Sequence, residues 1–135
     1  VAVALGKEGL IVPVVKQADN KSLVEISQEV KSLVEKARSK KILPDEVTGG
    51  TFTLTSVGAV GVSYYQTPII NQPESAILGT GPIMEKPAVK KGQIMIAPMM
   101  PYSLTFDHRV INGFGAEQFL AKLKELVENP GLLLL

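Results

Sequence analysis

The chain has 135 residues, of which 14 are basic, 13 are acidic, one is histidine and none is cysteine. This length suits a single domain, and the lack of cysteine excludes disulfides and a thiolate nucleophile. A lone histidine argues against a protein-built metal site, the balanced charge argues against a nucleic-acid partner, and no apolar run is long enough to predict a membrane span.

The first half of the chain predicts two short strands and one helix. Residues 1–5 and 10–15 are rich in valine and isoleucine, which indicates strands, and Pro13 predicts an edge position or an irregularity in the second. Residues 22–39 predict the clearest helix, because apolar residues recur there at helical spacing. Ser22 followed by Glu25 has the spacing of a capping box.

The second half predicts several strands and a closing helix. Residues 51–55 alternate polar and apolar, residues 67–71 and 75–79 are further strand candidates, and residues 102–106 form the last strand. Residues 90–92 indicate a hairpin tip between 88–89 and 93–97. The final helix runs from about Asn112, a suitable N-cap, to Glu128. This order predicts the α+β class with a mixed, largely antiparallel sheet.

One segment combines features that suit chemistry. Asp107-His108-Arg109-Val110-Ile111-Asn112-Gly113 lies where the last strand leads into the last helix, whose first amides and dipole favour negative charge. A histidine can change between base and acid near neutral pH. On the residues alone a structural or merely exposed histidine remains the commoner alternative, and Asn112 remains equally well explained as a helix cap.

The segment from Ser103 to Gly113 closely resembles the C-terminal signature of the E2 acyltransferases, the dihydrolipoamide acyltransferases of 2-oxo acid dehydrogenase complexes. The family pattern is His, three residues, then usually Asp and Gly; chloramphenicol acetyltransferase shares the pattern and the fold. The chain carries Asn112 at the Asp position, and an amide can cap a helix but cannot form an ion pair. Other family-like stretches follow in order: residues 9–14, 22–23, 49–55, 67–73, 76–79 and 128–130.

The resemblance implies a chloramphenicol acetyltransferase-like fold with helices on one face of the sheet, and residues 1–135 as the C-terminal part of a catalytic domain. It implies acyl transfer between dihydrolipoamide and coenzyme A, the lipoyl group being carried on a separate domain. His108 would be the general base, and Asn112, at the family's Asp position, would be a further catalytic residue. A hydroxyl would stabilise the oxyanion, and it falls on Thr55, with Ser56 as the rival. Tyr65 and Leu78 are candidates for lining the coenzyme A channel.

The same resemblance implies a homotrimer in which base and oxyanion donor come from different subunits. Such trimers would assemble into a cubic or dodecahedral core, with Leu132–Leu135 as a candidate contact, and the E1 and E3 components would join through domains outside this chain. The expected location is the cytoplasm, or the mitochondrial matrix in a eukaryote. Two alternatives stay open: an assembly-only truncated core without turnover, and a small-molecule acetyltransferase of the chloramphenicol type. The acyl group is left open.

Overall fold

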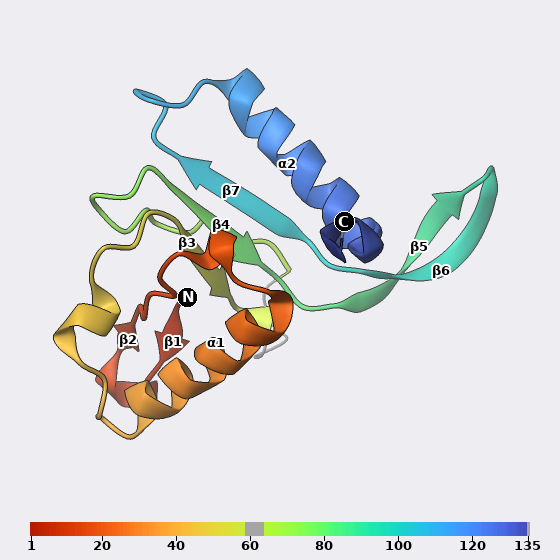
Figure 1. Cartoon of the computed structure of the whole chain (residues 1–135). Helices are drawn as coiled ribbons and strands as arrows, with labels where there is room; N and C mark the ends of the chain where they lie inside the picture. Colours follow the sequence, from red (N-terminus) through yellow and green to blue (C-terminus); the bar gives the residue numbers. More distant parts are fainter. Residues whose placement is uncertain (59–63, 135) are drawn as a thin grey trace.

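The computed structural model describes residues 1–58 and 64–134, and within them the chain forms two α-helices and three small sheets (Figure 1). The strands are β1 (Val3–Ala4), β2 (Leu10–Ile11), β3 (Thr53–Ser56), β4 (Ala76–Thr80), β5 (Met84–Lys90), β6 (Gln93–Met99) and β7 (Tyr102–Phe106). The helices are α1 (Leu23–Arg38) and α2 (Gly113–Glu128), with short 3-10 turns at Gly6–Glu8, Ala18–Asn20, Pro44–Val47 and Pro130–Leu134. The predicted α+β class with mixed, largely antiparallel pairing is confirmed.

The N-terminal strands are shorter than the sequence predicts. β1 and β2 pair antiparallel over two residues each, with Val3 opposite Ile11, and the run ends before Pro13, which cannot donate to a ladder. The capping box that starts α1 is confirmed: Glu25 N–H donates to Ser22 Oγ at 3.3 Å, and Ser22 N–H donates to the Glu25 carboxylate at 2.8 Å. The two residues of this box are only three positions apart, so local chemistry defines the start of the helix.

The central sheet has the order β3-β4-β7, with β3 parallel and β7 antiparallel to β4. Its middle strand is the most buried, through Ala76, Ile77 and Leu78. In this register Thr55 lies beside Gly79, and Gly79 lies beside Ser103. The end of β7 is therefore level with the start of β3, across β4, and lies at the opposite end of the sheet from the end of β3.

The prediction of a strand at residues 67–71 is wrong. This stretch belongs to no strand among the described residues, and Pro68 and Pro73 within and after it lack the N–H groups that a ladder needs. Side chains anchor its start instead: Gln66 Nε2 donates to the Thr80 carbonyl at 3.0 Å, and Ser103 Oγ donates to the Gln66 carbonyl at 2.6 Å. The Gln66 side chain lies over Gly79, where an added Cβ would come within 2.6 Å of Nε2.

The β5–β6 hairpin extends away from the rest of the molecule (Figure 1). Its tip is confirmed, because Lys91 and Gly92 both have positive φ, at 52° and 77°, as a two-residue type I′ turn requires. The strands are longer than predicted, pairing from Met84 opposite Met99 to Lys90 opposite Gln93. Alternation places five exposed apolar residues on one face, which we call the hairpin apolar face: Pro87, Val89, Ile94, Ile96 and Pro98.

Helix α2 is only partly covered in the single chain. Ala116 is buried, and Phe119 contacts Phe52 with ring centroids 5.6 Å apart. The other apolar residues spaced along the helix are half-buried or exposed in the single chain: Phe119, Leu120, Leu123, Leu126 and Val127. Beyond α2, the turn Pro130–Leu134 leaves Leu132 and Leu133 partly exposed, and Leu135 lies outside the described residues.

The solvent-accessible surface area of the single chain is larger than that of a compact monomer. It exposes 9975 Å² at a mass of 14.5 kDa, whereas a compact monomer of this mass exposes about 6,900 Å². The excess includes the hairpin apolar face, where the relative exposure of Ile96 is 71% and that of Ile94 is 81%. Across the described part of the chain, no helix has the length and apolar character needed to cross a membrane.

Candidate active site

His108 lies on a short turn that joins β7 to α2. The turn is held at its start because Asp107 N–H donates to the Ser75 carbonyl at 2.8 Å, continuing the pairing of β7 with β4 by one residue. It is closed because the Val110 and Ile111 N–H groups both donate to the Asp107 carbonyl, at 3.1 and 3.0 Å. The backbone around His108 is therefore tied both to the sheet and to itself.

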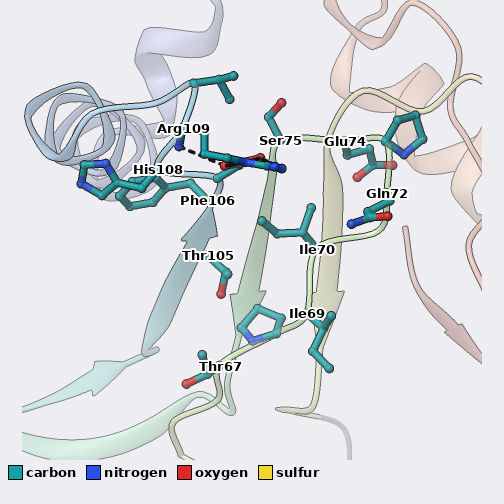
Figure 2. A pocket seen from close by; sticks show the side chains of 14 residues that line it. Thr67, Ile69, Ile70, Gln72, Glu74, Ser75, Thr105, Phe106, His108 and Arg109 are labelled. Atoms are coloured by element: carbon teal, nitrogen blue, oxygen red, sulfur yellow. Dashed lines mark hydrogen bonds and ion pairs between the residues drawn. The ribbon is translucent and has the colours of Figure 1, made fainter.

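The imidazole is exposed in the single chain and lies next to Phe106, with ring centroids 5.6 Å apart and planes inclined by 40°. Figure 2 shows that His108 and Arg109 leave the turn in different directions: His108 lies beside Phe106, and Arg109 extends toward Ser75. An exposed imidazole can meet a substrate proton from outside the chain, as a general base must.

Asp107 belongs to the family-like segment, whose sequence predicts no role for it, and the structure gives it one. Its carboxylate accepts the Arg109 backbone N–H at 2.9 Å and a bidentate pair from the guanidinium, with Nε at 2.9 Å and an Nη at 2.6 Å. The Arg109 guanidinium, followed by the Arg109 backbone amide, lowers the pKa of Asp107 to about 2. An aspartate two residues before an arginine is a usable signal, because such side chains bind the amide two positions on.

A groove of about 920 Å³ opens beside this turn (Figure 2). One wall is the extended segment containing Pro68 and Ile70, and the other is the end of β7 with the His108 turn. The lining residues are Thr67, Pro68, Ile69, Ile70, Gln72, Pro73, Glu74, Ser75 and residues 105–110. The groove is open and largely apolar, and Ile69 on its wall is 91% exposed.

The hydroxyl candidates lie at the other edge of the central sheet. Thr55 is half-buried, and Ser56 is exposed with its Oγ accepting the Gly58 N–H at 3.3 Å. Thr55 is level with Ser103 across the sheet, and the three residues from there to Phe106 span about 10 Å of strand before the His108 turn begins. One chain therefore does not bring the predicted base and the predicted oxyanion donor together.

The remaining predicted site residues lie in different surroundings. Asn112 Oδ1 accepts the Gly115 N–H at 2.8 Å, so its predicted role as N-cap is confirmed. Leu78 is 6% exposed at the centre of β4, opposite Leu104. Tyr65 is 77% exposed and edge-to-face with Tyr64. The catalytic role of Asn112 and the coenzyme contacts of Leu78 and Tyr65 stay predictions.

Among the described residues, no group of three or more His, Cys, Asp or Glu side chains could hold a metal ion.

Solved structures share this fold. The chain superposes on Azotobacter vinelandii dihydrolipoamide acetyltransferase with a TM-score of 0.90 and 41% identity, over 99% of this chain and 54% of that one. It superposes equally, with a TM-score of 0.90 and 42% identity, on the cubic core of a pyruvate dehydrogenase multienzyme complex, over 99% of this chain and 54% of the other. The fold is thus that of acetyltransferase catalytic cores.

The family model for the 2-oxoacid dehydrogenases acyltransferase catalytic domain matches residues 1–135. The chain belongs to this family, and the resemblance read from the sequence is confirmed. Among curated relatives, the dihydrolipoyllysine-residue acetyltransferase component of the Staphylococcus aureus pyruvate dehydrogenase complex is 48% identical over 127 residues, which cover 94% of this chain and 29% of the relative. The chain thus spans less than a third of that relative and about half of the solved cores.

Proposed function

We propose that this chain forms part of the catalytic domain of a dihydrolipoamide acetyltransferase and that it transfers an acetyl group between dihydrolipoamide and coenzyme A in a pyruvate dehydrogenase complex. Membership of the acyltransferase family supports the reaction class. The acetyl group and the complex are supported by the Staphylococcus relatives, which are acetyltransferase components at 48% identity.

One observation carries the assignment of the residues. The Azotobacter structure belongs to an investigation of one serine, one histidine and one asparagine in the catalytic mechanism, where the histidine stands 52 positions after the serine and four before the asparagine. Ser56, His108 and Asn112 have the same spacing in this chain. This match favours Ser56 over the predicted Thr55 as the oxyanion donor, and the exposure of Ser56 at the end of β3 agrees with it.

The reaction transfers an acetyl group from a thioester to a thiol. A free thiol with a pKa of about 8.5 is only a few per cent thiolate at neutral pH, so the coenzyme A thiol needs a base as it attacks the acetyl carbonyl. The neutral His108 imidazole takes that proton, and the Ser56 hydroxyl donates to the oxyanion of the tetrahedral intermediate. The intermediate collapses, the carbon–sulfur bond to dihydrolipoamide breaks, and His108 returns the proton to the departing thiolate.

The site would be completed by a second copy of the chain. His108 and Ser56 lie on opposite edge strands of the central sheet within one chain, so a neighbouring copy is needed to place Ser56 near the imidazole. The surface excess over a compact monomer supports extensive assembly. A homotrimer, packed into a cubic core like that of the solved relative, satisfies both requirements, with the E1 and E3 components joining through other domains.

The proposed function is tested by mixing the complete natural protein with acetyl-coenzyme A and dihydrolipoamide and measuring S-acetyldihydrolipoamide. We expect saturable transfer that depends on both substrates. An assembled protein without turnover would support the assembly-only alternative, and preferential acetylation of a hydroxylated acceptor would support the chloramphenicol type. Succinyl- and branched-chain acyl-coenzyme A in parallel assays test the acetyl preference.

Placing a charge on the hairpin apolar face should disrupt assembly. In Ile96→Glu the new carboxylate would be buried without a partner wherever another chain covers this face, and such burial is strongly unfavourable. We expect the molar mass measured by light scattering to fall below that of the wild-type assembly. Gln93→Glu adds the same charge on the opposite face of the same strand and should leave the mass unchanged. A normal assembly of Ile96→Glu would show that this face is not a subunit contact.

A further inference from the structure

We propose that Asp107 is a positioning residue whose carboxylate, by binding the Arg109 backbone amide, holds the turn that presents His108. The proposal rests on the proposed function, in which His108 is the base, and adds a residue that does not itself touch the substrates. What it positions is the backbone on either side of the imidazole.

The contact spans His108 directly. The Asp107 carboxylate accepts the Arg109 N–H at 2.9 Å, so the bond closes a ring that contains the His108 backbone. The Asp107 carbonyl meanwhile accepts the Val110 and Ile111 N–H groups, and the Asp107 N–H is bound to Ser75 on the neighbouring strand segment. Asp107 thereby uses its side chain, its carbonyl and its amide to join the turn to the sheet.

The backbone amide bond, rather than the ion pair, is the positioning contact. The Arg109 side chain is 85% exposed, and ion pairs in that setting contribute little because water and salt screen them. The Asp107 side chain is far less exposed, at 22%, and its bond to the amide needs an oxygen acceptor but no charge. An asparagine can supply the same acceptor, whereas alanine cannot.

Loss of the Asp107 carboxylate is expected to lower kcat rather than to raise KM. A displacement of about 1 Å in a catalytic group can reduce rate by about 10²-fold, so releasing the turn in Asp107→Ala should reduce kcat roughly 10- to 100-fold. The KM for coenzyme A should change by less than about twofold, because the contact binds no substrate. Asp107→Asn and Arg109→Ala should each keep kcat within about threefold of the wild type, because both retain an acceptor for the amide at position 109.

The experiment compares these three variants, in the complete assembled protein, with Asp19→Ala as an exposed control distant in sequence. Acetyl transfer gives kcat and KM, and hydrogen exchange gives the protection of the amide at position 109. We expect that amide to be protected in the wild type and in Asp107→Asn, and to exchange faster in Asp107→Ala.

Full turnover in Asp107→Ala, or an equally large loss in Asp107→Asn, would overturn the proposal. If Asp107→Ala does not fold, the other two variants still decide, since a loss beyond about tenfold in either assigns the effect to the charge pair. A wild type that lacks acyl transfer altogether would instead refute the proposed function, and the exchange measurement would still report on the turn.

Discussion

Replacing His108 with alanine is expected to reduce acetyl transfer by at least about 10²-fold while folding and assembly persist. The imidazole is exposed and lies beside Phe106 in the single chain, so its removal should leave the core intact. The chain has no other histidine to take the proton. Steady-state kinetics with acetyl-coenzyme A and dihydrolipoamide measures the loss, and light scattering confirms the assembly.

A matched control for this variant is Lys122→Ala, an exposed change on α2 that should leave turnover unchanged. Both substitutions remove a long polar side chain from the surface of the same chain, and only one removes a base. An assembled His108→Ala protein with near-normal turnover would eliminate the assignment of His108 and require a base from another residue or from solvent.

The second large effect concerns the oxyanion. Ser56→Ala is expected to reduce kcat by about 10²- to 10³-fold with a similar KM, because the hydroxyl contact forms mainly in the transition state. Thr55→Ala, one residue away on the half-buried side of β3, should stay much closer to the wild type. The opposite ranking of the two variants would return the role to Thr55, and a change in KM alone would indicate substrate binding instead.

Hybrid assemblies test whether the two residues meet across subunits. His108→Ala and Ser56→Ala chains, each with strongly reduced turnover when alone, would be dissociated, mixed in equal amounts and reassembled. A site shared by two neighbouring chains should then be intact in about a quarter of cases in random trimers, restoring a measurable fraction of activity. Mixtures that stay as inactive as either parent would show that each chain builds its own site.

Features that depend on near neighbours in the chain could be predicted well. The Ser22–Glu25 capping box, the tip at Lys91 and Gly92, and the Asn112 cap each rely on contacts within about three residues, so their residue types carried the information. The position of His108 between a strand and a helix belongs to the same group. The family resemblance rested on such local stretches, which explains why it too was confirmed.

Only the tertiary structure decided which distant parts meet. The register of β3, β4 and β7 separates His108 from Thr55 and Ser56, and it depends on pairing between residues more than 20 positions apart. The loss of the strand expected at residues 67–71 and the exposure of Ile96 are equally non-local. Local sequence specifies a turn or a cap because the interacting atoms are close along the chain. Pairing between distant strands and the burial of exposed faces depend instead on the free energy of the whole folded and assembled protein.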